Sequence, residues 1–231
     1  MKKNIAIVQS NYIPWKGYFD LINMVDEFVI LDTVQYTRRD WRNRNKIKTP
    51  EGAQWVTIPV EVKGKYEQAI NETKISDPKW AKKHWGSILH NYSKAKSFHH
   101  FKVYFEELYL NNNQTWLSEI NYSFIEAINK LLGIKTKISF SDQFEVDGKK
   151  TELILKICNA CNATGYISGP AAKGYFDGKM AREKNIRIHW MDYSGYPEYE
   201  QLFPPFDHHV SILDLIFNEG ENAVNFMKSF R

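Results

Sequence analysis

The stretch that decides the fold is residues 6–46, AIVQSNYIPWKGYFDLINMVDEFVILDTVQYTRRDWRNRNK. An apolar run at 5–8 stops at Gln9, and a second apolar run at 28–31 stops at Asp32. Between these runs lie a short loop and apolar residues at helical spacing, which predict a helix. The order strand, loop, helix, strand opens a βαβ arrangement, so we predict an α/β fold with a mainly parallel sheet.

Polar side chains follow the predicted strands at the points where the strands end. Gln9 and Asp32 follow the first two strands, while Ser168 and Asp192 follow two later ones. In an open parallel sheet, groups just past the carboxyl ends of the strands face a common crevice in which ligands bind. We expect these four residues to converge if their strands are adjacent, an arrangement that the sequence leaves open.

A basic and aromatic run follows the second strand and contains Gln35, Trp41, Arg42, Asn43 and Arg44. The planar arginine fork can donate two parallel hydrogen bonds to a phosphate or carboxylate. Asparagine offers both donors and acceptors to a ligand rich in hydroxyl groups. We interpret this run as the wall of an anion-binding site, with a solvated basic loop as the alternative.

A second candidate anion site lies at Ser168, Gly169, Lys173 and Tyr175. Backbone N–H groups near Gly169 and at a helix start can receive an anion, which Lys173 can neutralise. The spacing is not that of a Walker P-loop. A turn that carries a surface lysine is the alternative interpretation.

His189 is the candidate general base, because its ordinary pKa lies near neutrality. Asp192 and Asp32 are the other catalytic candidates, and a structural histidine is the alternative for His189.

Cys158 and Cys161 form a CxxC pair without a second pair or a histidine at zinc-finger spacing. We therefore predict a buried, reduced pair and no metal.

The middle of the chain changes character and predicts helices at 78–91, 98–110 and 115–132. At 231 residues and 43% hydrophobic composition, the chain can bury a real core. We predict a single α/β domain over 1–231 with a mostly helical insertion at about 77–133. Residues 55–60 are predicted to be a short strand after a turn at 49–52, and residues 196–206 a lid or pocket wall. We expect Ser211 to cap a helix that begins there, with Asp214 as its capping-box partner, and a terminal helix at 221–230.

Charge and hydropathy exclude several classes of protein. The net charge of +4, from 31 basic and 27 acidic residues, suits a local positive patch and makes a nucleic-acid partner unlikely. No apolar run is long enough to span a bilayer, and the N-terminus leads directly into a strand. We expect a cytoplasmic protein without membrane insertion.

Four runs together resemble the WbqC-like family: VQSNYIPWKGYFDLI, FVILDTVQYTRRDWRNRN, YISGPAAKGYFD and SILDLIFNEG. The resemblance implies a place among bacterial surface-polysaccharide and sugar-modification genes, such as those for O-antigen and lipopolysaccharide biosynthesis. The opening also looks like pantothenate synthetase and related Rossmann-like nucleotidyltransferase folds. Only Gly17 of their H-x-G-H motif is kept here, and Lys173 stands in place of an arginine. The cofactor stays open between ATP and an activated acyl donor.

We therefore predict an enzyme that tailors an amino sugar or sugar nucleotide by acyl or aminoacyl amide formation, as a transferase or ATP-dependent ligase. Arg42, Arg44 and Lys173 would hold phosphate or carboxylate, Trp15 and Trp41 would stack, and His189 or Asp192 would take the proton from the attacking amine. The candidate substrate-binding residues are Gln9, Tyr12, Trp15, Gly17, Tyr18, Gln35, Trp41, Arg42, Asn43, Arg44, Ser168, Gly169, Lys173 and Tyr175. A non-catalytic sugar-nucleotide or polysaccharide-binding module and a single-stranded nucleic-acid binder are the alternatives.

Overall fold

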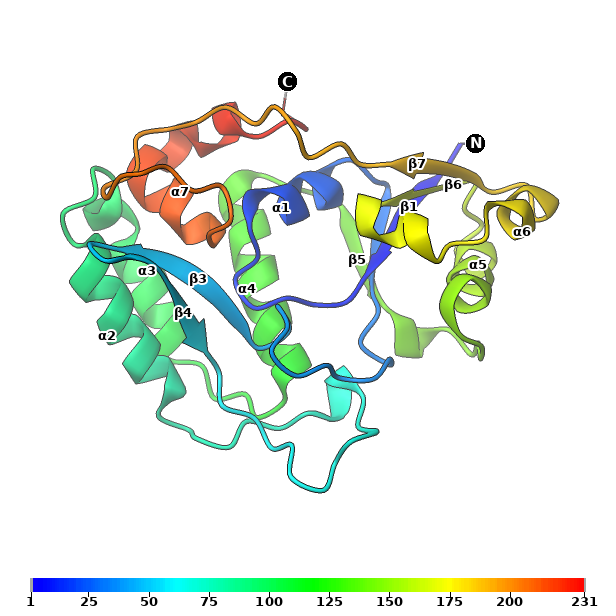
Figure 1. Ribbon diagram of the computed structural model, residues 1–231, viewed down its shortest axis with the longest axis horizontal. Helices are drawn as coiled ribbons and strands as arrows, with labels where there is room; N and C mark the ends of the chain where they lie inside the picture. Colours follow the sequence, from blue (N-terminus) through cyan, green and yellow to red (C-terminus); the bar gives the residue numbers. More distant parts are fainter. Residues whose placement is uncertain (1, 231) are drawn as a thin grey trace.

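A five-stranded parallel sheet forms the centre of the computed structural model, which describes residues 2–230 (Figure 1). Its strands lie in the order β5-β2-β1-β6-β7, and each neighbouring pair is parallel. The strands are β1 Asn4–Val8, β2 Glu27–Ile30, β5 Lys137–Phe140, β6 Gly165–Ser168 and β7 Arg187–Trp190. The chain starts in the middle strand, builds outward through β2 and β5, and then returns to the other side of β1. The prediction of an α/β fold with a mainly parallel sheet is confirmed.

Seven α-helices connect and cover these strands within residues 2–230. They are α1 Lys16–Asn23, α2 Trp80–Tyr92, α3 Phe98–Leu110, α4 Leu117–Leu132, α5 Lys150–Ala160, α6 Gly178–Glu183 and α7 Ile212–Glu219. The predicted helices at 78–91, 98–110 and 115–132 match α2, α3 and α4 to within two residues at each end. A helix expected at 221–230 is instead a 3₁₀ segment, Gly220–Phe226, a correction in this last part of the described chain.

Side chains of successive strand residues point to opposite faces of the sheet, and each face has its own core. Ile5, Ile7 and Val29 pack with Ile154 of α5 and Ala181 of α6. Figure 1 shows α5 and α6 together on this side of the sheet.

The larger core lies on the other face and continues into the helical middle of the chain. Ala6 and Phe28 belong to the same buried cluster as Trp80 of α2, Phe105 of α3 and Phe124 of α4. The apolar packing is thus continuous from the sheet to the helices between β4 and β5. The division into one domain with an insertion at about 77–133 stays a prediction.

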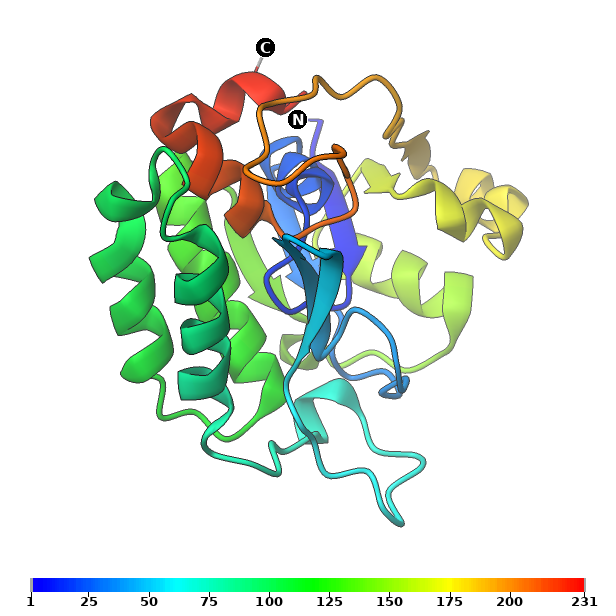
Figure 2. The ribbon, with the colours of Figure 1, turned by 60° about the vertical axis from the view of Figure 1, so that its left-hand side comes forward.

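A β-hairpin follows the basic run, where the sequence predicted only a loop and then a strand over 55–60. β3 (Arg44–Thr49) pairs antiparallel with β4 (Gly52–Thr57), with Arg44 opposite Thr57. Gly52 has a positive φ of 107°, which the turn requires. Asn45 and Ile47 alternate inward, and this alternation places the end of the basic run on a strand. Figure 2 shows the hairpin between the helical middle and the segment that follows β6.

A long segment without helix or strand, residues 191–211, runs from β7 to α7, and we call it the strap (Figure 1). Two buried carboxylates anchor it: Asp20 accepts from the Tyr196 hydroxyl at 2.5 Å, and Asp214 accepts from the Tyr199 hydroxyl at 2.7 Å. Ser211 caps α7 as expected, since its hydroxyl accepts from the N–H of Leu213. The capping role expected for Asp214 is wrong, because its carboxylate is turned to side chains of the strap and the core.

The two cysteines are buried and form no disulfide. Burial raises the pKa of Cys158 to about 12 and also raises the pKa of Cys161, so both thiols stay protonated near neutral pH. Within residues 2–230, no group of three or more His, Cys, Asp or Glu side chains is placed to hold a metal ion. Over the same residues, none of the helices has the length and apolar character needed to cross a membrane.

Candidate functional site

The carboxyl ends of β2, β1, β6 and β7 lie side by side in the sheet, as a shared crevice requires. Asp32, Gln9 and Asp192 follow β2, β1 and β7, and Ser168 is the last residue of β6, so the four residues lie in that spatial order. Neighbouring strands lie about 4.8 Å apart, so the four ends extend over roughly 15 Å. The reversal of the chain beside β1 puts the middle of this row at the position where such sheets bind ligands.

Asp32 is enclosed by protein and braces the loop that follows β1. It is 3% exposed, and its two oxygens accept from the N–H of Ser10 at 2.8 Å and the hydroxyl of Ser118 at 2.5 Å. Burial raises the pKa of the Asp32 carboxyl, while these hydrogen bonds act against the rise. Both oxygens are engaged, so this carboxylate positions the loop against α4.

Arg42 shapes the same loop from the opposite side. Its guanidinium donates to the carbonyl oxygens of Gln9 and Ser10, each at 3.3 Å, and to the side-chain oxygen of Asn11 at 2.5 Å. The hydroxyl of Tyr18 donates to the same carbonyl of Gln9 at 3.1 Å. Arg42 is 9% exposed, and its donors are directed mainly to the backbone, which makes it a positioning residue for the strand end.

Four other predicted site residues hold chain segments together. The Tyr12 hydroxyl contacts His84 Nδ1 and the Tyr109 hydroxyl, each at 2.9 Å, and Tyr12 is fully buried. The remaining contacts are those of Asn43 with the carbonyl of Ile58, Ser168 with the hydroxyl of Tyr166, and Gln35 with the carbonyl of Tyr66.

A row of aromatic rings connects the basic run to the loop that follows β6. The guanidinium of Arg44 lies 4.0 Å from the ring centre of Trp55, and the rings of Trp55 and Trp41 are 5.0 Å apart. Trp41 and Trp15 line one cavity of about 160 Å³ beyond the end of β1.

The row continues from Trp15 toward β6. The ring of Trp15 packs edge-on against Tyr193 at 5.0 Å. Tyr193 in turn lies 3.6 Å from the point where a Cβ on Gly169 would stand. A series of aromatic contacts therefore links the two segments that the sequence proposed as anion sites.

Gly17 gives Trp15 the room for its position in this row. A Cβ at Gly17 would stand 2.3 Å from a carbon of the Trp15 ring, well inside contact distance. The glycine at the start of α1 thus allows the indole to fold back over the first turn of the helix.

Lys173, Tyr175 and Asp192 are exposed at the far end of the row, next to β6 and β7. The Lys173 ammonium lies 6.0 Å from the ring centre of Trp190. Hydrogen bonds from the backbone and side chain of Ser194 lower the pKa of Asp192, and Lys228 and Lys173 add to the effect. This carboxylate is ionised at neutral pH and open to a ligand.

His189 lies apart from the aromatic row. It is exposed on the edge strand and lines a separate hollow with Lys2, Asn4 and Gly165, which are at or near the starts of β1 and β6. The structure therefore brings together Trp15, Trp41, Arg44 and the β6 loop, and leaves His189 in other surroundings.

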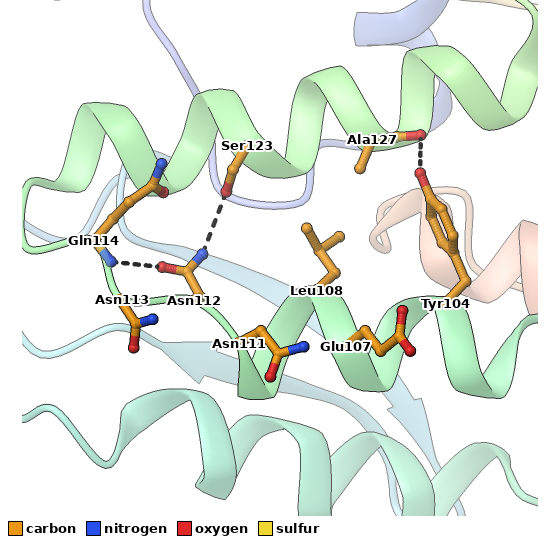
Figure 3. Close-up of a pocket in the computed structure, with 9 residues that line it drawn as sticks. All are labelled: Tyr104, Glu107, Leu108, Asn111, Asn112, Asn113, Gln114, Ser123 and Ala127. Atoms are coloured by element: carbon orange, nitrogen blue, oxygen red, sulfur yellow. Dashed lines mark hydrogen bonds between the residues drawn. The ribbon is translucent and has the colours of Figure 1, made fainter.

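A larger hollow of about 410 Å³ lies between α3 and α4 (Figure 3). Asn112 donates to the Ser123 hydroxyl at 3.3 Å and accepts from the N–H of Gln114 at 3.1 Å, while the Tyr104 hydroxyl donates to the carbonyl of Ala127 at 2.8 Å. Ser123 and Ala127 are on the face of α4 opposite to Ser118, which contacts Asp32. This hollow contains none of the predicted site residues.

Several residues of the site were not predicted from the sequence, among them Asn11, Trp55, Tyr193 and His209. Trp55 reaches Trp41 only through the β3–β4 pairing, and recognition of that hairpin would have revealed it. Tyr193 and His209 belong to the strap, where no periodic pattern indicates which side chains turn inward.

Comparison with known proteins gives a family and one curated relative. The model of the WbqC-like protein family matches residues 9–226. The chain is 48% identical over 229 residues to the uncharacterized protein Rv1507c of Mycobacterium tuberculosis (strain ATCC 25618 / H37Rv), covering 99% of each chain. No solved structure gives a significant match.

Proposed function

The chain belongs to the WbqC-like protein family, and from this premise we propose that it is an enzyme that tailors an amino sugar or a sugar nucleotide. The proposed setting is surface-polysaccharide or glycoconjugate biosynthesis in the cytoplasm. The proposed reaction is acyl or aminoacyl amide formation, by a transferase or an ATP-dependent ligase. The substrate would carry a phosphate, as in a nucleotide-linked sugar.

One observation carries the proposal: four parallel strands end side by side beneath a surface that is both aromatic and basic. Such a row of strand ends is the usual ligand site of an open α/β sheet. The strand order also supports the Rossmann-like part of the fold prediction. We propose, more specifically, that the fold is of the nucleotidyltransferase or pantothenate-synthetase-like kind.

The charged side chains along the aromatic row give the substrate an orientation. Arg44 and Lys173 would neutralise phosphate or carboxylate at the two ends of the aromatic row. Asp192 would face the amino group of the acceptor, since it is the exposed carboxylate at a strand end. The loops around the substrate would be held in position by Arg42, Asp32 and Asn43. Gly169 would donate its backbone N–H to the substrate.

In the proposed reaction, the amine nitrogen forms a bond to the acyl carbon of an activated acyl donor. The bond from that carbon to the leaving group breaks, and the leaving group departs with the electron pair. The amine proton passes to Asp192, because His189, the other candidate from the sequence, lies in a separate hollow.

The exposed tryptophans favour one alternative function, single-stranded nucleic-acid binding. Trp41 and Trp55 are 37% and 42% exposed, and Arg44 stacks on Trp55, as in platforms that bind bases. Salt distinguishes the two functions. Binding of an oligonucleotide releases counterions from several phosphates, so its affinity falls steeply as the salt concentration rises. A non-catalytic binding module would retain affinity for the sugar nucleotide and give no product.

The test is calorimetric titration with UDP- and dTDP-linked amino sugars and with ATP, followed by mass spectrometry of mixtures that contain acyl donors. We expect Lys173→Ala to weaken sugar-nucleotide binding about tenfold, the effect of about 1.4 kcal/mol. Asp192→Asn should reduce product formation with little change in affinity. Lys82→Ala, an exposed lysine on α2, is the matched control and should leave both unchanged. The absence of binding by every nucleotide and sugar nucleotide would contradict the proposal.

A further inference from the structure

The cavity between Trp15 and Trp41 has the size and the lining of a site for one small ring. Its volume is about 160 Å³, and it is lined by Asn11, Pro14, Trp15, Trp41, Asn45 and His209. None of these side chains carries a full charge when the histidine is neutral. A site with aromatic walls and few polar groups is typical of small-molecule recognition, and its lack of charge favours a neutral group.

Aromatic neighbours hold both tryptophan walls in place. Trp41 packs against Trp55, and Trp15 packs edge-on against Tyr193 at 5.0 Å and Tyr196 at 5.6 Å. Walls that are already ordered lose little conformational freedom when a ligand enters, which favours affinity. The electron-rich face of an indole attracts partially positive C–H groups, which the faces of a sugar ring present.

The polar groups of the cavity form a complementary donor and acceptor. The Asn11 side-chain oxygen accepts from Arg42, and its Nδ2 has no hydrogen-bond partner among residues 2–230. His209 Nδ1 lies 3.3 Å from Asp207 Oδ1, which favours a proton on Nδ1 and leaves Nε2 as an acceptor. Gln201 fixes the backbone of Asp207 through two hydrogen bonds, at 2.9 and 2.8 Å. A hydroxyl group can both donate and accept, so this pair suits it.

Asn45 shapes the cavity without a free polar group. Its Nδ2 donates to the carbonyls of Tyr12 at 3.1 Å and Ile13 at 2.8 Å, and its Oδ1 accepts from the N–H of Lys46 at 2.8 Å. Recognition of a ligand therefore falls to Asn11, His209 and the two indoles.

We propose that this cavity binds the neutral sugar ring of the substrate, between Trp15 and Trp41, with Asn11 donating to a ring hydroxyl and His209 accepting from one. The inference rests on the proposed function for the identity of the site and names the part of the substrate that enters it. The phosphate-bearing part then lies outside the cavity, toward Arg44 or Lys173.

Saturation-transfer NMR on the full chain tests this inference with methyl glycosides of neutral hexoses and N-acetylhexosamines as probes. Saturation should reach the ring protons of at least one glycoside. Trp41→Ala and His209→Ala should each reduce that signal about fivefold or more, as expected when a contact central to binding is removed. Tyr66→Ala and His90→Ala, which remove exposed rings elsewhere, should leave the signal unchanged.

The His209→Ala variant keeps the test valid if Trp41→Ala fails to fold. The His209 side chain is 79% exposed, so its loss should not disturb the core. No saturation of any glycoside, or equal signals in wild type and both variants, would overturn the inference.

Parallel titration with UDP separates this inference from the proposed function. Glycoside binding that depends on Trp41, without measurable binding of UDP or of any nucleotide or sugar nucleotide, would support the inference and contradict the proposed substrate. UDP binding that Lys173→Ala weakens, without a glycoside signal, would support the proposed substrate and overturn the inference.

Discussion

At the scale of the residue, Gly17 controls where Trp15 lies. A methyl group at position 17 would stand 2.3 Å from the indole, so Gly17→Ala must displace Trp15 from Tyr193. We expect a loss of about 1–3 kcal/mol in the free energy of unfolding, as in other overpacked sites. Urea unfolding measures this loss, and near-UV circular dichroism reports the changed surroundings of the indole.

A second glycine provides the control for this prediction. Gly86 lies within α2, and a Cβ there would have no neighbour within 4 Å. Gly86→Ala should therefore stabilise the protein by about 0.5–1 kcal/mol through the better helix propensity of alanine. If Gly17→Ala were as stable as wild type, Trp15 would not be held in the position described.

The sequence indicates which residues stand at strand ends, but it does not indicate the direction of their side chains. Gln9 and Asp32 are visible because each stops an apolar run. Arg42 and Arg44 look alike in the sequence, yet Arg42 donates to carbonyls of the loop after β1, while Arg44 stacks on Trp55 and donates to the carbonyl of Arg39. The difference depends on the β3–β4 register and on the loop after β1, which are long-range features. Only the three-dimensional structure therefore shows which site residues support the loops and which face a ligand.

At the scale of the element, the strap depends on the buried carboxylate of Asp214. It accepts from Tyr92 at 2.9 Å, Tyr199 at 2.7 Å and Gln201 at 2.8 Å. Burial raises the pKa of the Asp214 carboxyl, and the three hydrogen bonds act against the rise. A hydrogen bond to a buried carboxylate is stronger than one at the surface, so each donor matters for the order of the strap.

We expect Tyr199→Phe to destabilise the protein by about 1–3 kcal/mol, because it leaves one carboxylate lone pair without a donor. Amide hydrogen exchange should also become faster in the strap, residues 191–211, than in the sheet. Tyr66→Phe, at a side chain that is 77% exposed, is the control and should change neither quantity. Unchanged exchange in the strap of the Tyr199 variant would show that other contacts hold it.

The predicted helices agree with the structure because their apolar spacing is strong over three turns or more, as in α4, which is followed by Gly133 with a φ of 74°. The hairpin was missed because lysine and arginine conceal its alternation, and Lys48 is buried although its type suggests exposure. Its N–H donates to the hydroxyl of Tyr92 at 2.8 Å, a contact between segments far apart in the sequence. Elements defined by local periodicity were predictable, and those defined by partners elsewhere in the chain were not.

At the scale of the whole molecule, the strand order turns separate polar residues into a candidate site. Sequence reasoning could state that four strand ends would converge if their strands were adjacent and parallel. The pairing of β1 with both β2 and β6 provides that adjacency, and it depends on which helices cover each face. No local pattern in the chain specifies that order, which explains why the crevice was a conditional prediction.

The pH dependence of stability is a property of the whole molecule, and the buried His84 contributes to it in mild acid. The His84 ring contacts Tyr12 through Nδ1 at 2.9 Å and the carbonyl of Thr57 through Nε2 at 3.1 Å. Burial lowers the pKa of His84 to about 4 from an ordinary value of 6.5. Below pH 6.5, His84 binds a proton in the unfolded chain, whereas in the folded protein it stays neutral until near pH 4. The free energy of unfolding should therefore fall with pH across this window, by roughly 3 kcal/mol in total.

Glu27 causes a second decrease in the free energy of unfolding at lower pH. Burial alone would raise its pKa, but hydrogen bonds from Lys137, Lys3 and Ser139 lower it to about 2 from 4.5. Its contribution is thus complete above pH 4.5 and is lost as pH falls toward 2, below most of the His84 window.

Urea unfolding of wild type and His84→Gln at pH 7, 6, 5 and 4 tests the assignment of the upper window. The variant has no imidazole to protonate, so its free energy of unfolding should fall less steeply between pH 6.5 and 4 than that of wild type. His90→Gln, at an exposed histidine on α2, should keep the wild-type slope. Parallel slopes for wild type and His84→Gln would mean that the acid sensitivity of the fold has its origin in other groups.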